Sequence, residues 1–323
     1  MKRVLTGIQS TGTPHLGNIL GAILPAIEMA NQPDNDSFLF IADMHSLTQI
    51  KNAEELRQNT LNVAATWLAF GLNPEKTVFY RQSDIPEVTE LTWFLMCHFP
   101  FQRLTLAHSF KDKADRLSDV NTGLFTYPML MAADILLYDA NEVPVGKDQL
   151  QHLEITRDVA IKLNQSVKKD ILILPEAKIQ KDTQLVPGID GNKMSKSRNN
   201  FISLFQTDKA LRKSIMRIET DSTPLEDPKD PESCNVFNIF KLIASNEQTE
   251  ELAQKYRAGN FGYGHAKQAL FELICERFSE ERERYNYFVD HPDEVEQILK
   301  QGAQKARKVA QETLSRVRKE MGY

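Results

Sequence analysis

The amino-acid sequence predicts an α/β protein in which a parallel sheet carries helices on both faces, followed by a region built of helices alone. Three observations lead to this prediction. The chain has 323 residues, enough for about two domains, and 41% of them are hydrophobic, as in a globular protein. Strand-like and helix-like segments alternate through the first half. After a polar loop at 188–200, nearly every segment has the periodicity of a helix.

Apolar runs rich in β-branched residues predict the strands of the first half, and apolar residues three and four positions apart predict its helices. Pro25 is expected to kink the first helix. The expected strands are 3–8, 37–42, 77–81 and 171–174, and the expected helices are one from about residue 17 and those at 53–70, 86–99, 125–138 and 148–164. This order is typical of a Rossmann-like sheet, which binds ligands beyond the carboxyl ends of its strands.

The second half is expected to be helical apart from a proline-rich loop at 223–231. The expected helices are 208–218, 236–244, 249–257, 265–288 and 293–321. We therefore divide the chain into a Rossmann-like domain at 1–190, a loop and linker at 191–205, a helical domain at 206–290, and a C-terminal helix at 291–323 that is expected to pack back on the first domain.

Composition excludes several classes of protein. The longest apolar runs are too short to span a bilayer, and no apolar segment of signal-peptide length follows the basic N-terminus. Three cysteines far apart provide neither a disulfide framework nor a zinc site, which favours a reducing compartment such as the cytoplasm. The net charge of −5 argues against a general polyanion binder. A nucleic-acid partner would need a local basic surface, for which 302–323 is a candidate.

The first candidate motif is the turn GIQSTGTPHLGN at 7–18, which joins the first strand to the first helix. Exposed amides and the helix dipole at such a place suit a phosphate chain. His15 and Asn18 put neutral donors on one side of the first turn, and Gly17 allows a flat ring to approach the backbone. An ordinary strand-to-helix turn is the alternative interpretation.

Two further motifs place charged side chains in loops. KMSKS at 193–197 holds two lysines and two hydroxyls, which suit the charge that develops on a leaving pyrophosphate. A solvated basic loop is the alternative. GKDQ at 146–149 opens a helix, where Asp148 is placed to bond a ribose hydroxyl, to cap the helix, or to do both.

The fourth motif is the apolar segment at 127–138, in which Tyr127, Met131, Asp134 and Tyr138 share one helix face. A buried aspartate is costly unless it is paired. Asp134 therefore either caps a neighbouring backbone group or accepts a hydrogen bond from a ligand. His45 follows the carboxyl end of a strand, a good location for a site residue, although a lone histidine is more often structural.

These four motifs, in this order, resemble those of the class I aminoacyl-tRNA synthetases, and within that class those of the tryptophan-specific members. PHLGN at 14–18 is similar to the HIGH signature, and KMSKS at 193–197 matches the signature of that name letter for letter. LMAADILLY at 130–138 and VPVG at 143–146 resemble the tryptophan-specific pattern. The similarity extends over most of the chain, to the helix at 302–306.

The resemblance implies a two-step reaction. Tryptophan and Mg·ATP give tryptophanyl-adenylate and pyrophosphate, and the acyl group then passes to the 3′ end of tRNA(Trp). The resemblance further implies a homodimer, a helical domain that contacts the anticodon, and no metal besides the Mg²⁺ carried by ATP.

The resemblance also implies roles for individual residues. It assigns catalysis to Asn18, Lys113, Lys193 and Lys196. It assigns ATP binding to Gln9, Ser10, Thr11, His15, Gly17, Asn18, Gly146, Lys147, Asp148, Leu185, Val186, Lys193, Met194, Ser195, Lys196 and Ser197. It assigns tryptophan binding to His45, Tyr127, Met131, Asp134, Val143, Val145 and Gln149.

Three positions depart from the family's pattern. Asn18 stands where HIGH has its second histidine, Lys147 replaces a carboxylate near the ribose, and Ser109 replaces a glutamine near the ammonium group of the amino acid. The alternatives are a tyrosine-specific enzyme of the same class, a small nucleotidyltransferase, and a non-catalytic tRNA-binding paralogue. The Asp134 helix argues against the first, the helical second half against the second, and the intact lysines against the third.

Overall fold

A computed structural model describes residues 1–106, 120–146, 149–179 and 186–323. Within these ranges, five strands form one parallel sheet in the order β3-β2-β1-β4-β5. The strands are β1 (Lys2–Ile8), β2 (Asn35–Ile41), β3 (Val78–Arg81), β4 (Glu142–Val145) and β5 (Glu176–Ile179). The predicted α/β class, with a parallel Rossmann-like sheet, is confirmed.

The predicted strand at 171–174 is wrong, because the fifth strand begins at Glu176. Asn164, on the preceding helix, replaces the strand ladder for this segment. Its Oδ1 accepts hydrogen bonds from the amides of Ile171 and Leu172 at 3.1 and 3.0 Å, and its Nδ2 donates to the Leu172 carbonyl at 2.9 Å. Buried backbone groups need partners, and here one side chain supplies them. The sequence interpretation also missed β4, whose apolar run is interrupted by a proline.

The helices of the first half lie close to their predicted positions. They are α1 (Leu16–Asn18), α2 (Leu24–Ala30), α3 (Asp43–Ser46), α4 (Ala53–Ala69), α5 (Glu87–His98), α6 (Phe101–Leu104), α8 (Thr122–Leu136) and α9 (Leu150–Val167). Between α1 and α2 lies a π-helical segment, Ile19–Ile23. The expected disturbance by Pro25 therefore takes the form of a change in hydrogen-bond pattern just before the proline, which occupies the first turn of α2.

The second half is helical in the described residues, as predicted. Its helices are α10 (Asp208–Met216), α11 (Asn235–Phe240), α12 (Asn246–Ala258), α13 (Tyr263–Arg277), α14 (Ser279–Asp290) and α15 (Pro292–Met321). The single helix expected at 265–288 is wrong, since the chain leaves helical geometry at Phe278, between α13 and α14. Phe278 is buried, so the residue at this break packs its ring into the core. No helix in the described part of the chain has the length and apolar character needed to cross a membrane.

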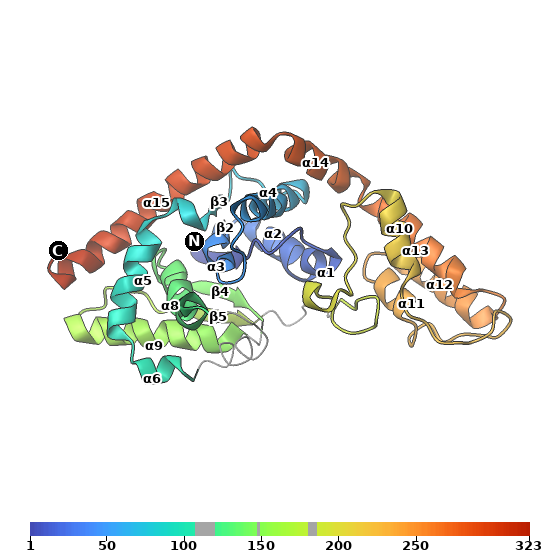
Figure 1. The fold of residues 1–323 in the computed structure, drawn as a ribbon, viewed down its shortest axis with the longest axis horizontal. Coiled ribbons are helices and arrows are strands. Elements are labelled where there is room, and N and C mark those ends of the chain that lie inside the picture. Colours follow the sequence, from blue (N-terminus) through green and yellow to red (C-terminus); the bar gives the residue numbers. More distant parts are fainter. Residues whose placement is uncertain (107–119, 147–148, 180–185) are drawn as a thin grey trace.

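Helices cover both faces of the sheet (Figure 1). Successive strand side chains point to opposite faces, so β2 and β3 each contribute to two cores. One core joins the strands to α4 and to the helices of the second half, and it includes Leu39, Ile41 and Phe79. The other joins them to α5, α8 and α9, and it includes Phe38, Phe40 and Tyr80. Burial on both faces explains the nearly continuous apolar runs of the strands.

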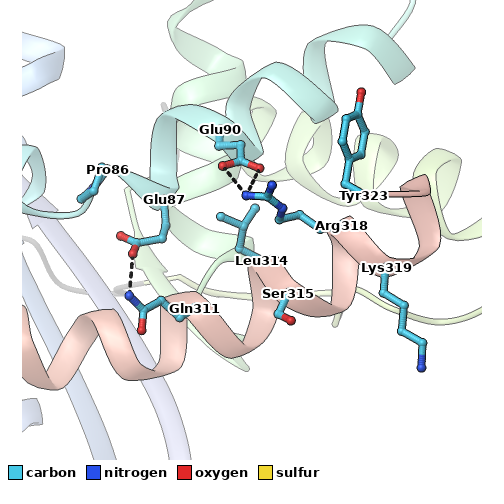
Figure 2. Close-up of a pocket in the computed structure, with 9 residues that line it drawn as sticks. All are labelled: Pro86, Glu87, Glu90, Gln311, Leu314, Ser315, Arg318, Lys319 and Tyr323. Carbon is cyan, nitrogen blue, oxygen red and sulfur yellow. Dashed lines mark hydrogen bonds and ion pairs between the residues drawn. The ribbon is translucent and has the colours of Figure 1, made fainter.

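The long helix α15 returns from the helical group to the sheet and ends near α5 (Figure 1). At Gly302 its backbone lies directly against β3, where an added Cβ would stand 1.7 Å from the Phe79 carbonyl oxygen. Further along, Arg307 bonds Glu87 of α5. Gln311 bonds the same carboxylate, and Arg318 pairs with Glu90 (Figure 2).

A groove of about 420 Å³ separates α5 from the end of α15. The arginines that line or flank this groove belong to the basic stretch 302–323, and they pair with carboxylates of the first half. Arg316 does the same with Asp139. Much of the positive charge that suggested a nucleic-acid surface is therefore used to dock the helix.

Candidate active site

The carboxyl ends of β1 and β4 lie side by side, and a candidate motif follows each strand. The turn at 9–15 follows β1, and Gly146 follows β4, where its carbonyl accepts the amide of Gln149 at 2.9 Å as α9 begins. The chain leaves β1 toward β2 and β3 on one side and reaches β4 on the other. Ligands of α/β sheets bind at such a reversal of strand order. The first and third motifs therefore flank one place at the carboxyl edge.

The turn after β1 is tied to two neighbouring helices. Ser10 is fully buried, and its amide and hydroxyl donate to the Ser46 hydroxyl of α3 at 3.0 and 3.1 Å. Thr13 accepts a hydrogen bond from the Asn62 amide of α4 at 2.9 Å. Gln9, by contrast, is exposed. These hydrogen bonds fix Ser10 and Thr13, while Gln9 at the start of the turn stays exposed to solvent.

His15 and Asn18 form a reciprocal cap at the start of α1. The Asn18 amide donates to Nδ1 of His15, and the His15 amide donates to Oδ1 of Asn18, both at 3.2 Å. Burial and the nearby charge of Lys196 lower the pKa of His15 to about 4, so the ring is neutral at pH 7. Because Nδ1 accepts, the ring proton sits on Nε2, which leaves Nε2–H of His15 and the side-chain Nδ2 of Asn18 as donors toward a ligand.

The loop that carries KMSKS is organised by the buried side chain of Asn200. Its Oδ1 accepts the Ser195 amide at 2.7 Å, and its Nδ2 donates to the Lys193 carbonyl at 3.1 Å and to Asp190 at 2.7 Å. The amide of Met194 donates to the Val186 carbonyl at 3.0 Å. One buried amide thus closes the loop, and Lys193 of the loop stays exposed.

Two side chains of this loop contact the turn after β1. The Lys196 ammonium donates to the Thr11 carbonyl at 3.1 Å, and the Gly17 amide donates to the sulfur of Met194 at 3.2 Å. Gly12, at φ +105°, lies beside the Lys196 ammonium, in a backbone conformation that favours glycine. Burial lowers the pKa of Lys196 to about 8. Motifs far apart in the sequence therefore meet at one surface.

Ser195 and Ser197 lie at the outer end of the loop. Their hydroxyls are 2.8 Å apart, and the Ser195 hydroxyl also accepts the Arg198 amide at 3.3 Å. Lys193 forms a backbone bridge with Pro187. Four of the predicted site residues, Lys113, Lys147, Asp148 and Leu185, lie outside the described residues.

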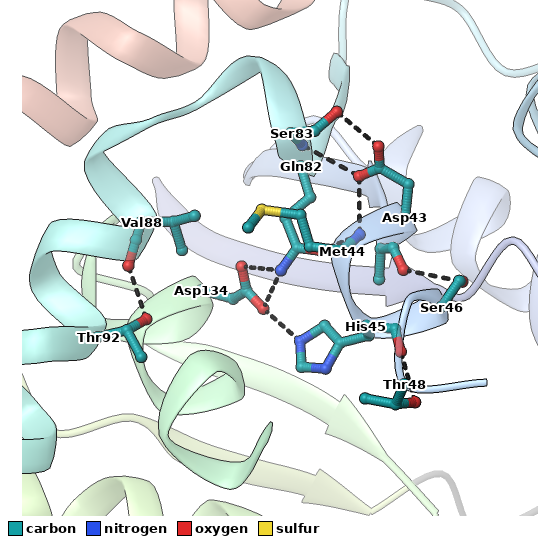
Figure 3. Close-up of polar contacts among 11 residues, drawn as sticks. Asp43, Met44, His45, Ser46, Thr48, Gln82, Ser83, Val88, Thr92 and Asp134 are labelled. Carbon is teal, nitrogen blue, oxygen red and sulfur yellow. Dashed lines mark hydrogen bonds and ion pairs between the residues drawn. The ribbon is translucent and has the colours of Figure 1, made fainter. Parts of the chain in front are cut away.

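Asp134 is buried within α8 and bonds two side chains from other elements (Figure 3). His45 Nε2 lies 2.9 Å from its Oδ2, and Gln82 Nε2 donates to both carboxylate oxygens at 2.8 Å. Burial raises the pKa of Asp134, and the bonds from His45 and Gln82 oppose that rise. The backbone cap considered from the sequence is therefore wrong, because the described partners are side chains.

The other residues predicted to bind tryptophan lie on the elements around Asp134. The Tyr127 hydroxyl is 2.9 Å from Nε2 of His152, and the Tyr127 ring meets the His45 ring edge-on at 6.2 Å. Val143 and Val145 of β4 are buried in the core that also contacts the half-buried Met131. Tyr127 and Met131 also share α8 with Asp134.

This arrangement can be compared with known proteins. The model of the family "tRNA synthetases class I (W and Y)", where the letters stand for tryptophan and tyrosine, matches residues 1–279. The chain belongs to this family. Membership in a class I synthetase family accounts for the loop at 193–197 lying against the turn at 9–18.

Relatives of this class I family match the chain over its whole length. The tryptophan–tRNA ligase of Fusobacterium nucleatum subsp. nucleatum is 48% identical over 322 residues, which cover 100% of this chain and 98% of that protein. The crystal structure of tryptophanyl-tRNA synthetase from Campylobacter jejuni complexed with ADP and tryptophan has a TM-score of 0.96 and 46% identity, and covers 99% of this chain and all of that one. The enzyme from Mycoplasma pneumoniae has a TM-score of 0.82 and 32% identity, covering 100% and 98%.

The sequence interpretation missed three polar residues that organise this class I site. Gln82 holds Asp134, Ser46 holds the first turn, and Asn200 holds the loop. Gln82 directly follows β3, so the rule that selected His45, a polar residue just beyond a strand, could have found it. Asn200 and Ser46 carry no such signal, because asparagine and serine are common in loops and at helix ends.

Proposed function

We infer that this chain is a tryptophan–tRNA ligase, which activates tryptophan with ATP and then transfers it to tRNA(Trp). Membership in the W and Y family narrows the amino acid to two. The relatives of 46–48% identity that bear the tryptophan name favour tryptophan. The observation that carries the proposal is the contact of the lysine loop with the turn after β1, at the same sheet edge as a buried carboxylate.

Adenylate formation needs positioning and charge stabilisation more than it needs a base. We assign the phosphates of Mg·ATP to the turn at 9–18, where Ser10, His15 and Asn18 fix the backbone, and to the ammonium groups of Lys193 and Lys196. The two lysines would stabilise the pyrophosphate as it leaves. Gly17, Met194 and Val186 would border the adenine. Mg²⁺ is expected to arrive with ATP as part of the substrate.

The remaining assignments complete the nucleotide site. Gly146 with Lys147 and Asp148 would meet the ribose, Leu185 would border the adenine, and Lys113 would reach the phosphates, as the family resemblance implies. Gln9, Thr11, Ser195 and Ser197 would contribute polar groups around them. These roles are open to single-residue substitution, each with the KM for ATP as its readout.

The tryptophan side chain would enter the apolar pocket around Asp134. The indole ring has one N–H donor, and the buried carboxylate would accept it. Met131, Val143 and Val145 would form the walls, and Tyr127, Gln149 and His45 would complete the polar rim. Phenylalanine in this pocket would leave the carboxylate without that partner, which is a strong basis for discrimination.

A second copy of the chain is the proposed partner of an apolar surface near α5 and α8. Its members are exposed although they are large and hydrophobic, and they are Leu47, Trp93, Phe101, Leu106 and Val120. Leu47 shares a pocket with residues of α5 and α8, and Asn121, next to Val120, bonds the Thr48 carbonyl at 2.9 Å. Large apolar side chains that are left exposed on neighbouring elements are typical of an interface.

Each region of the chain is assigned one part of this function. We assign catalysis to 1–190 with the loop at 191–205, contact with the tRNA anticodon to 206–290, and docking onto the first domain to the helix at 291–323. The cytoplasm is the expected location, because the reaction serves protein synthesis and the three cysteines are free thiols.

The test is ATP–pyrophosphate exchange with each of the twenty amino acids, in the absence of tRNA. Exchange with tryptophan alone is expected. Exchange with tyrosine alone would make the chain a tyrosine-specific enzyme, in which Asp134 would bind the phenol hydroxyl. No exchange with any amino acid would contradict the activation step and leave a non-catalytic tRNA-binding role.

A further inference from the structure

We propose that Gln82 is a positioning residue for amino-acid selection: its side-chain amide orients the Asp134 carboxylate and keeps it ready to accept the indole N–H. The proposal rests on the proposed function, in which Asp134 reads the tryptophan ring. Gln82 acts through Asp134 rather than on the substrate.

The geometry of the Gln82 amide is determined at both of its ends. The side chain is 1% exposed and lies in the short helical turn Gln82–Asp84, directly after β3. Oε1 accepts the backbone amide of Met44 at 3.1 Å, and Nε2 donates to both oxygens of Asp134 at 2.8 Å. A backbone amide only donates, and a carboxylate without a proton only accepts, so the oxygen and nitrogen of this side chain can be assigned without ambiguity.

A second carboxylate, that of Asp43, fixes the two backbone segments on either side of Gln82 (Figure 3). Asp43, at the start of α3, accepts hydrogen bonds from the amide of Met44 at 3.1 Å and from the amide of Ser83 at 3.0 Å. The Ser83 hydroxyl donates to the other Asp43 oxygen. Asp43 therefore joins the start of α3 to the turn after β3, on both sides of the Gln82 side chain. The orientation of the Gln82 side-chain amide is therefore set by the backbone around it, before any ligand binds.

This arrangement leaves the carboxylate able to accept a ligand. A carboxylate has about four acceptor sites. Gln82 bridges the two oxygens and His45 takes one more site on Oδ2, so Oδ1 can still accept an indole N–H. Gln82 is neutral, which means that it stabilises the ionised carboxylate without forming a competing ion pair. A lysine or arginine at this position would offer the carboxylate a permanent counter-ion instead.

The protonation of Asp134 depends on groups from three elements. His45 of α3 bonds it, and the hydroxyls of Tyr80 on β3 and of Tyr138, in the turn after α8, interact with its charge. Burial raises the pKa of Asp134, and the Gln82 bond works against that rise. Without the amide, the carboxyl would keep its proton to a higher pH, and a protonated carboxyl would lose its charge-assisted bond to the indole.

The first test is Gln82→Met, which keeps the length and burial of the side chain and removes its donor. In tryptophan-dependent exchange we expect the KM for tryptophan to rise about tenfold or more, with the KM for ATP within about twofold. The acid limb of kcat/KM for tryptophan should move to higher pH. The matched control is Gln254→Met, an exposed glutamine on α12, which should leave every parameter unchanged.

A second variant separates hydrogen bonding from packing. Gln82→Glu places a carboxyl next to Asp134, and that carboxyl can replace the amide only when it carries a proton. Its KM for tryptophan should therefore approach that of the unchanged chain as the pH falls, the opposite of the trend for Gln82→Met. A packing defect would give both variants the same pH profile.

The outcomes are distinct. An unchanged KM for tryptophan and an unchanged pH profile in Gln82→Met would overturn the positioning role while leaving the proposed function intact. A parallel rise in both KM values with a lower melting temperature would overturn it as well, in favour of a general structural role. If the unchanged chain gives no tryptophan-dependent exchange, the proposed function fails, and the role of Gln82 fails with it.

Discussion

The ammonium of Lys196 carries a charge that the fold makes sensitive to pH. It is bonded to the Thr11 carbonyl, and burial lowers its pKa to about 8, from an ordinary value near 10.5. Near pH 8, about half of these side chains are neutral in the free protein. Anionic phosphates beside the ammonium would favour the charged form and raise its pKa again.

ATP binding is therefore expected to take up a fraction of a proton near pH 8 and none near pH 6, where Lys196 is already charged. Calorimetry in two buffers of different ionisation enthalpy measures this uptake directly. Lys196→Arg should abolish it, because arginine stays charged throughout. Equal uptake by the unchanged chain and the arginine variant would show that another group titrates.

Asp134→Asn tests the carboxylate with nearly no change in volume. We expect the preference for tryptophan over phenylalanine, measured as the ratio of kcat/KM in pyrophosphate exchange, to fall by about tenfold to a hundredfold. The KM for ATP should stay close to its original value. Equal losses for tryptophan and ATP would contradict the assignment of this pocket to the amino acid.

Sequence reasoning singled out residues whose own motif identifies them and missed several of their partners. Asp134 stands out as an acid in an apolar helix, and the lysines stand out in KMSKS. Gln82 acquires its meaning only from Asp134, 52 positions later, and Ser46 only from Ser10, 36 positions earlier. Such pairs are created by the tertiary fold, so a single sequence carries little signal for them.

At the scale of elements, the contact of α15 with β3 depends on a position without a side chain. An added Cβ at Gly302 would stand 1.7 Å from the Phe79 carbonyl oxygen, so the helix or the strand would have to move. Gly302→Ala is expected to lower the free energy of unfolding by about 1–3 kcal/mol or more, as overpacking does. Urea denaturation measures this change.

The control for this substitution is Gly264→Ala on α13, where no atom lies within 4 Å of the added Cβ. Alanine favours a helix over glycine, so stability there should stay equal or rise by up to about 1 kcal/mol. Equal effects of the two substitutions would show that the close contact of α15 with β3 does not limit packing.

Each of the elements that the sequence misplaced can be traced to one residue. Asn164 satisfies the amides at 171–172, so an apolar run that resembles a strand is not one. Pro144 interrupts the run that became β4, although the strand still pairs with β5 through all four of its residues. Phe278 divides one helical pattern into two helices. Periodicity reports burial reliably and reports the ends of elements poorly.

At the scale of the whole molecule, the helical part directly contacts the turn after β1. Tyr285 of α14 is hydrogen-bonded to the side chain of Thr13, and its ring stacks on Phe205 at 3.7 Å. Because Thr13 accepts from Asn62 of α4, its hydroxyl proton is available to Tyr285. A displacement of α14 would therefore change the hydrogen bonding of Thr13 in the turn after β1.

Tyr285→Phe keeps the stacked ring and removes this link. The KM for ATP is expected to rise by about twofold to tenfold, with the KM for tryptophan and the melting temperature nearly unchanged. Tyr287→Phe, an exposed tyrosine of the same helix that bonds Glu294 instead, is the matched control. A change in the KM for tryptophan alone would contradict the proposed path.

The proposed dimer makes a prediction at the same scale. Trp93 is 64% exposed on α5, and Trp93→Glu would place a charge within the apolar surface. Sedimentation is expected to show a dimer for the unchanged chain and a monomer for this variant. Leu225→Glu, at an exposed leucine of the helical part, should remain a dimer. A monomeric unchanged chain would remove the proposed interface.

The order of whole regions was predictable because it follows from strand–helix alternation and its end. The meeting of the loop at 193–197 with the turn at 9–18 was not predictable from spacing, and it entered only through the family resemblance. Nothing in the periodicity of α15 shows that its arginines bond Glu87, Glu90 and Asp139 rather than a nucleic acid. Charge patterns show where cations lie along the chain and leave their partners to the tertiary fold.

The placement of α15 also bears on how the chain folds as it is made. β3 is the outermost strand of its side of the sheet, and an uncovered outer strand can pair with another chain. Synthesis completes β3 long before α15, because the whole helical part lies between them along the chain. During that interval the strand lacks the cover that α15 later provides, so protection against self-association depends on α15, and loss of that helix would turn a folding intermediate into a seed for aggregation.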